Sequence, residues 1–187
     1  YYSVSVLLDR NTHIKNSPFT IRIISADIEA RLSHAAGDGL SAGTAGVESV
    51  FAVDVRDAYG NAANAPAGVL PPSVTVSMGD DVASVANVTA VGGYGNEFFV
   101  EYIATVSGEY SVGVFVGGVK VSGSPFESVV VAGAASAGAS IAEGEGLTGG
   151  SAGTSRVTFS ILSHDAYGNM RTSGGDVFEV SISGKIN

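Results

Sequence analysis

The chain has 187 residues, 18 acidic and 9 basic, with three histidines and no cysteine or tryptophan. Without cysteine there are no disulfides, thiolate metal centres or thiol catalysis, and a net charge of −9 without a basic cluster argues against nucleic acid as a partner. Charged residues make up 14% of the chain, against about 25% in an ordinary soluble domain, which favours a surface that packs against neighbours in an assembly.

The chain repeats itself at an interval of about 107 residues. Five segments recur in the same order, namely Asn16–Phe19 as Gly123–Phe126, Gly37–Leu40 as Gly144–Leu147, Gly43–Gly46 as Gly150–Gly153, Asp57–Asn61 as Asp165–Asn169, and Tyr2–Val4 as Tyr110–Val112. This predicts the last strands of one repeat in residues 1–24, a complete repeat in 25–131 and the first half of another in 132–187. Since the chain opens on Tyr1-Tyr2 rather than Met, we expect an internal piece of a longer protein.

Within each repeat, apolar residues alternate with polar ones, which is the period of a β-strand rather than a helix. The expected strands of the complete repeat are, in chain order, Phe51–Val55, Val74–Met78, Phe99–Ala104, Tyr110–Val116 and Val119–Val131. The third part echoes the first two with Phe159 and Ile161 and with Phe178, Val180 and Ile182. Residues 132–140 are interpreted as a weak first strand plus a short joint.

Turn residues complete this pattern. Gly117-Gly118 predicts a tight hairpin, because glycines accept the positive φ of a primed turn. Pro125 lacks an N–H, so its part of the last strand is expected at an edge or a bulge. About seven short strands per repeat predict an all-β fold of tandem immunoglobulin-like, antiparallel Greek-key sandwiches.

The motifs in their order resemble the filamin-type immunoglobulin-like repeat. They are Gly37–Leu40, Ala45-Gly46, Phe51–Val53, Asp57–Asn61, Gly108–Val112 and Gly123–Phe126, with Gly144–Leu147, Asp165–Asn169 and Gly174–Asp176 in the third part. The resemblance covers essentially the whole chain and implies the same sandwich fold. The insert of residues 62–72 and the low charge differ from the actin-crosslinking members, so actin crosslinking is not carried over.

Several of these residues are expected to have structural roles. Asp57 can bond turn amides while Gly60 and Asn61 take left-handed conformations, and Asp165, Gly168 and Asn169 repeat this turn. Tyr110 stands where a sandwich places a tyrosine whose hydroxyl bonds back to a loop. Phe126, after Pro125, is expected to bring the last strand back against the core.

Patterns that suggest an enzyme or a cofactor site fail on context. Ser41 and Ser151 each fit Gly-x-Ser-x-Gly, but no helix is expected after either serine, and the two matches are out of register with the repeat. Gly144–Gly149 fits Gly-x-Gly-x-x-Gly without a βαβ unit. The three histidines lie in different repeats, and Asp80-Asp81 is interpreted as a solvated turn rather than a calcium site. We therefore expect a protein that is not an enzyme and has no cofactor and no metal.

The resemblance implies a structural scaffold protein, a rod of repeats that pairs with an extended segment of a partner along an exposed strand edge. The family's edge maps to Ser73–Ser77 and then to Ala83–Val88, and the candidate partner-binding residues are Ser73, Thr75, Ser77, Ala83, Val85 and Val88. Val74, Val76 and Met78 are expected to face the core. A plain solvated edge, or one covered by a neighbouring repeat, is the alternative.

The expected partners are other proteins, either cytoskeletal proteins or segments of membrane proteins, together with neighbouring repeats. Nucleic acid is not expected, and no apolar run is long enough for direct insertion into a membrane. A cytoplasmic or cytoskeletal location, within a ciliary assembly for instance, is favoured. The alternative is an extracellular cell-surface adhesion protein, with which the glycosylation sequon Asn87-Val88-Thr89 is compatible.

Overall fold

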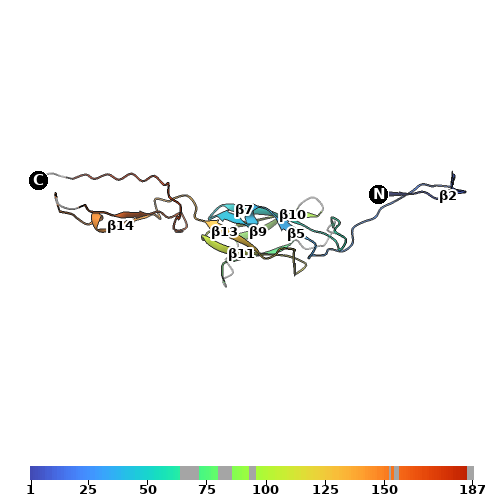
Figure 1. Ribbon diagram of the computed structural model, residues 1–187, viewed down its shortest axis with the longest axis horizontal. Coiled ribbons are helices and arrows are strands. Elements are labelled where there is room, and N and C mark those ends of the chain that lie inside the picture. Colours follow the sequence, from blue (N-terminus) through green and yellow to red (C-terminus); the bar gives the residue numbers. More distant parts are fainter. Residues whose placement is uncertain (64–71, 80–85, 93–95, 152, 154–155, 185–187) are drawn as a thin grey trace.

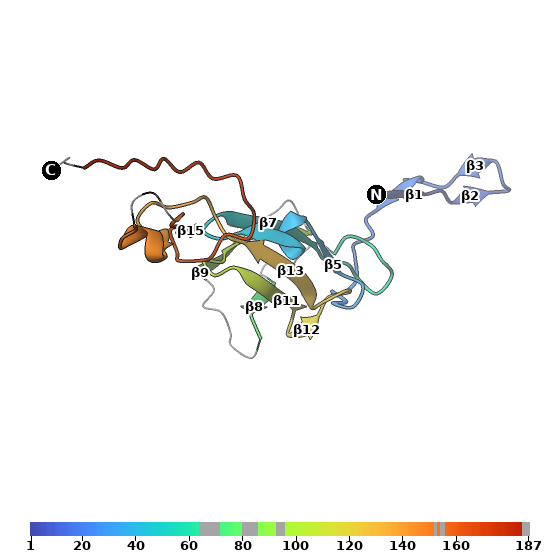
Figure 2. The same ribbon diagram turned by 60° about the vertical axis from the view of Figure 1, so that its left-hand side comes forward.

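The computed structural model describes residues 1–63, 72–79, 86–92, 96–151, 153 and 156–184, of which 86–92 by backbone alone. A β-sandwich lies in the middle of an elongated arrangement, with the N-terminal strands extending from one end and the C-terminal part from the other (Figure 1). Figure 2 shows the same order after a turn of 60°. The strands and two short 3-10 helices that the structure describes confirm the expected all-β class.

The first sheet of the sandwich contains four strands in the order β5-β7-β10-β9, and all neighbours run antiparallel. The bounds are His34–Ala36 for β5, Glu48–Asp54 for β7, Glu97–Ile103 for β10 and Ala86–Gly92 for β9. In β7 every second residue is buried, and in β10 the same alternation gives a half-buried Phe98 followed by buried Val100 and Tyr102. Register pairs Phe51 with Val100, so both side chains enter the core together.

The second sheet is formed around β11, which pairs with β8 on one side and with β12 and β13 on the other. Its strands are Ala42–Thr44 (β6), Ser73–Ser77 (β8), Gly108–Val116 (β11), Val119–Lys120 (β12) and Phe126–Val131 (β13). The last expected strand is thus divided in two. Pro125 lies in the interruption, because a residue without an N–H cannot complete the ladder.

The hairpin between β11 and β12 has the predicted geometry. Gly117 and Gly118 have φ of 58° and 80°, and Val116 pairs directly with Val119 across them. Two successive residues with positive φ define a primed two-residue turn, which matches the right-handed twist of the flanking strands. The structure therefore confirms the turn that the glycine pair predicts.

The first strand of the sandwich crosses from one sheet to the other. β5 pairs with β7 in the first sheet, whereas β6 pairs parallel with β13 in the second, and the 3-10 helix η1 (Asp38–Leu40) connects them. The crossing passes so close to β7 that a Cβ on Gly37 would lie 2.7 Å from the Cα of Phe51. The Gly-x-Gly-Leu motif therefore has a packing role, with its leucine, Leu40, buried in the core.

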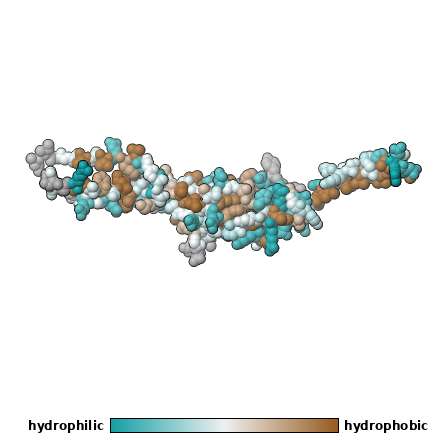
Figure 3. Space-filling model, in the orientation of Figure 1, coloured by the Kyte–Doolittle hydropathy of each residue, from teal (hydrophilic) through white to brown (hydrophobic). Residues whose placement is uncertain are grey.

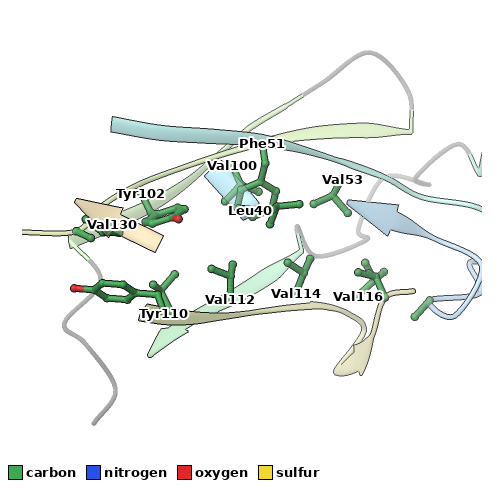
Figure 4. Packing of buried hydrophobic residues seen from close by; sticks show 14 of the residues in the cluster. Leu40, Phe51, Val53, Val100, Tyr102, Tyr110, Val112, Val114, Val116 and Val130 are labelled. Carbon is green, nitrogen blue, oxygen red and sulfur yellow. The ribbon is translucent and has the colours of Figure 1, made fainter. Parts of the chain in front are cut away.

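The core lies between the two sheets. From one sheet Phe51, Val53 and Val100 point toward Val112 and Val114 of the other (Figure 4), and none of the five is more than 2% exposed. The rings of Phe51 and Tyr102 meet edge to face with centroids 6.5 Å apart. The buried hydroxyl of Tyr102 donates to the carbonyl of Gly39, which joins the first sheet to the crossing strand.

The flanking parts reproduce pieces of this sandwich. β1 (Tyr2–Val4) pairs with β4 (Phe19–Ile21) in the register of β11 with β13, and β2 (Leu7–Leu8) pairs with β3 (Thr12–His13). At the other end β14 (Ile141–Glu143), η2 (Glu145–Leu147) and β15 (Ser160–Leu162) repeat β5, η1 and β7. The sequence repeat is therefore also a repeat of local structure.

Two expected strands of the third part do not form. Residues 177–184, with Phe178, Val180 and Ile182, contain no strand, and Ile182 is 96% exposed. In the sandwich their equivalent, β8, is a strand because it pairs with β11, whereas no described residue pairs with residues 177–184. Residues 132–140 contain a single bridge, Ala135 to Asp165, in place of a weak first strand.

Candidate functional site

Strand β8 forms one edge of the second sheet. Among the described residues it pairs only with β11, in the register Thr75 opposite Gly113. Val76 is buried and Val74 and Met78 pack partly against the core, as expected. Ser73 and Thr75 are exposed, and Ser77 is half-buried. The expected edge is thus present, with its small polar side chains on the outer face of the sheet.

The backbone groups that face the open edge of β8 follow from the bonds of β11. The N–H of Val114 donates to Ser124 Oγ at 2.9 Å, and its carbonyl accepts from Val121 at 3.1 Å, both on the side away from β8. Along an antiparallel strand, the N–H and C=O groups of successive residues point to opposite sides. Because those of Val114 point away from β8, the directly opposed pair Val114 and Val74 exchanges no hydrogen bonds. The N–H and C=O groups of Val74 and Val76 therefore face away from β11, where no described strand pairs with them, whereas those of Thr75 face β11.

The neighbouring strand of the expected edge is described only in part. Ala83 and Val85 lie outside the described residues, as do Asp80 and Asp81. β9 (Ala86–Gly92) covers the later part of the expected range 83–88 and continues beyond it, and Val88 lies within this strand. Asn87 of the sequon lies in β9 as well. β9 is itself the edge of the first sheet, where it pairs with β10.

A buried carboxylate organises the loop after β7. Asp57 is fully buried and accepts hydrogen bonds from the backbone N–H groups of Ala26, Tyr59 and Asn61, each at 2.9 Å. The Asn61 side-chain amide donates to both carboxylate oxygens. The bond from the Asn61 side chain, together with the backbone bonds, outweighs burial and lowers the pKa of Asp57 from 3.8 to about 2. The carboxylate thus ties the loop to the preceding linker.

The same arrangement recurs around Asp165. This buried carboxylate accepts from the N–H groups of Gly133 at 2.8 Å and of Tyr167 and Asn169 at 2.9 Å. Burial raises its pKa, but the bonds from the Asn169 side chain and the three amides outweigh it, so the pKa falls to about 2. Gly168, with φ of 84°, allows the turn.

One detail of the predicted turn is wrong. Gly60 has the expected positive φ, 80°, but Asn61 is not among the residues with positive φ, and neither is Asn169. Both asparagines instead use their side-chain amides to bond the aspartate four residues earlier. Asparagine is needed here as a hydrogen-bond donor rather than for its tolerance of the left-handed region.

The other structural residues lie near the predicted positions. The Tyr110 hydroxyl donates to the carbonyl oxygen of Val106 at 2.8 Å, which is the bond back to a loop that the sequence predicts. Phe126 packs partly against the core at the start of β13. Pro125 precedes it in the interruption between β12 and β13.

Residues with catalytic or metal-binding chemistry are scattered in the described part of the chain. Ser41 is followed by strand β6 rather than by a helix, and its hydroxyl donates to the Asp38 carbonyl at 3.2 Å. His34 lies 3.6 Å from Asp54 on the surface. Among the described residues no group of three histidine or carboxylate side chains is placed to hold a metal ion. Nor is any helix there long and apolar enough to cross a membrane.

Two sheets that share a split first strand, β5 and β6, define an immunoglobulin-like β-sandwich protein, and among the described strands β8 and β9 are edge strands of different sheets. Comparison with protein families then identifies the particular group. The model of the Filamin/ABP280 repeat matches residues 27–127, more than half of the chain. The chain belongs to this family, which confirms the resemblance seen in the sequence.

Solved structures of several proteins are similar to this chain. FdeC, an Escherichia coli adhesin, is 20% identical with a TM-score of 0.57, and the match covers 80% of this chain and 46% of that one. Invasin, a bacterial integrin-binding protein, is 18% identical with a TM-score of 0.55, and the match covers 86% of this chain and 30% of invasin's. The Lin-41 filamin domain is 22% identical with a TM-score of 0.47, covering 56% and 97%. This chain spans less than half of the FdeC and invasin structures, and at these identities the likeness to those two concerns the fold.

Proposed function

We propose that the protein is a non-enzymatic scaffold, a rod of filamin-type repeats that spaces its partners and binds them along strand β8. The partner contributes an extended segment that adds a strand to the second sheet, next to β8. The observation that carries this proposal is the position of β8, which pairs with β11 and with no other described strand. A free row of backbone donors and acceptors is a template for strand addition.

The chemistry of the edge indicates what kind of segment fits. Val74 and Val76 would supply the backbone bonds, and their side chains stay on the core side. The side chains on the outer face are Ser73, Thr75 and Ser77, which are small and uncharged and allow a second strand to approach. The segment is therefore expected to be uncharged and rich in β-branched residues, because such side chains suit cross-strand pairs. Cytoplasmic tails of membrane proteins and segments of cytoskeletal proteins are the candidate sources.

The register decides which substitution tests this docking. A proline at Thr75 would remove an N–H that the ladder to β11 needs, so a loss of binding would be confused with damage to the fold. Proline at Val74 removes an N–H that faces the open edge, a position where edge strands tolerate proline. Val74→Ala is the matched control, because it removes the same half-buried side chain and keeps the N–H.

The experiment uses an array of extended peptides from membrane-protein tails and cytoskeletal proteins, probed with the 187-residue chain. Peptides that bind the unaltered chain should bind V74P at least about tenfold more weakly, since a backbone hydrogen bond contributes about 1 kcal/mol and the ring obstructs approach. V74A should keep its affinity within a few fold. Equal binding by V74P, or no binding peptide in the array, would contradict docking at β8.

The second candidate function is adhesion at the cell surface, and the sequon Asn87-Val88-Thr89 in edge strand β9 favours it. FdeC is an adhesin and invasin binds integrin, and both share the fold. A peptide mass map of the native protein across Asn87 tests this reading. A glycan on Asn87 would place the chain in the secretory pathway and support adhesion. An unmodified Asn87 would favour the intracellular scaffold.

A further inference from the structure

Asn169 joins two parts of the chain that lie more than 60 residues apart in sequence. Its Oδ1 accepts a hydrogen bond from the N–H of Ser107 at 2.9 Å, and its Nδ2 donates to the carbonyl of Thr105 at 2.8 Å. Thr105 and Ser107 belong to the loop between β10 and β11 of the central sandwich. One side chain from the third part therefore satisfies both a donor and an acceptor of this loop.

Tyr167, from the same turn, packs onto a glycine of the central sandwich. A Cβ on Gly46 would lie 2.2 Å from Cε2 of the Tyr167 ring and 2.6 Å from its hydroxyl oxygen. The N–H of Gly46 donates to the carbonyl of Ala104 at 2.8 Å, so this glycine lies beside the loop that Asn169 binds. Only a residue without a side chain leaves room for the ring at this place.

The linker between the two parts is held on both sides. The N–H of Gly133 donates to Asp165, and its carbonyl accepts from the guanidinium of Arg171. Arg171 is fixed in turn by Asp176, with Nε and Oδ2 2.7 Å apart. Linker, turn and sandwich loop thus form one connected set of hydrogen bonds.

We propose that the Asp-Ala-Tyr-Gly-Asn turn of each repeat is a head-to-tail docking surface for the preceding repeat. The tyrosine fits over the glycine at the Gly46 position, and the asparagine binds the loop at the Thr105–Ser107 position. This inference rests on the tandem arrangement in the proposed function but not on the β8 edge. Its consequence is a fixed angle between consecutive repeats, in place of a freely bending rod.

The other copies of the tyrosine and of the glycine are the matching surfaces of the same joint. At one end Tyr59 is 82% exposed, compared with 55% for Tyr167, and Asn61 lines a hollow together with Tyr2 and Ile24. At the other end Gly153, the counterpart of Gly46, has φ of 82°, and no described atom lies within 4 Å of a Cβ built on it. The partner that fits each half is a further repeat of this family, with its own glycine or its own tyrosine and asparagine.

Spin-label distances across the joint test the proposal. The chain has no cysteine, so Glu127→Cys and Glu143→Cys, both at exposed positions, create the sole labelling sites in the 187-residue chain. The unaltered joint should give one narrow distance distribution. Y167A combined with N169A should broaden it severalfold in width. Y59A, at the matched position of the other turn, should leave it narrow.

Amide hydrogen exchange at Ser107 gives a second readout. Its N–H is bonded to Asn169, so N169A should speed its exchange severalfold, whereas Y59A should not. A broad distance distribution in the unaltered chain would contradict the proposed joint. So would a Y167A/N169A chain in which both the distances and the amide exchange of Ser107 are unchanged. Neither outcome bears on peptide binding at Val74, so the two proposals fail separately.

Discussion

Asp57 and Asp165, 108 residues apart in the chain, accept the same set of hydrogen bonds. Each is buried and bonded by a linker amide, by the amide two residues later and by the backbone and side chain of the asparagine four residues later. In both places the carboxylate is the point where a linker meets the part of the chain that follows it. Each of these two linkers is thus held by a negative charge that is stabilised by hydrogen bonds.

Acid should weaken this connection. Because the pKa of Asp57 is lowered to about 2 from 3.8, the folded state gains stability from the ionised group above about pH 4. This contribution falls as the pH drops from about 4 to 2. Titration of the carboxyl carbon by NMR should give a midpoint near 2, and Asn61→Ala should raise that midpoint because it removes the largest stabilising bond. A midpoint near 4 in the unaltered chain would contradict this account.

Loss of the Tyr110 hydroxyl should destabilise the sandwich by about 1 kcal/mol. Tyr110→Phe removes the bond to the Val106 carbonyl and keeps the buried ring in place. Urea denaturation followed by circular dichroism measures the change in the free energy of unfolding. Tyr2→Phe is the matched control, since Tyr2 is the repeat equivalent of Tyr110 but is 60% exposed. Equal effects of the two variants would show that the bond contributes nothing.

Gly37→Ala should lower the free energy of unfolding by more than the strain of a positive φ alone would. Gly37 has φ of 143°, and an added Cβ would lie 2.7 Å from the Cα of Phe51 in β7. Gly60 has φ of 80° with open space around it. Gly60→Ala should therefore lower the free energy of unfolding only through the strain of the left-handed backbone conformation, by about 1–2 kcal/mol. We expect Gly37→Ala to lower the unfolding midpoint in urea clearly further than Gly60→Ala. The reverse order would argue against close packing of the crossing strand.

Phe51→Ala should lower the free energy of unfolding by about 3–5 kcal/mol. The side chain is 2% exposed, so its removal leaves a cavity between the sheets. Phe99→Ala, at a residue that is 40% exposed on the same sheet, serves as the control and should cost far less. Thermal or urea unfolding of the chain measures both. A Phe51→Ala chain as stable as Phe99→Ala would place the core elsewhere.

Several features could be predicted from the sequence because they depend on neighbours in the chain. The period of two placed Phe51 and Val53 in a strand with buried side chains, and Gly117-Gly118 placed the hairpin. The predictions that needed distant partners were less accurate. Phe178 and Ile182 have the alternation of a strand, but no described residue pairs with them, and alternation along the chain does not specify a partner. The register that directs the free backbone groups to Val74 rather than Thr75 also depends on β11.

The sequence by itself determined the repeat, the all-β class and the family, since alternation and the order of short motifs are written along the chain. It also marked Asp57–Asn61 as a turn. Only the tertiary structure decided that the second copy of this turn reaches across to Gly46 and Ser107. The physical reason is that this contact joins residues more than 60 positions apart. Their distance is set by how two folded parts meet, and no local pattern in the chain encodes it.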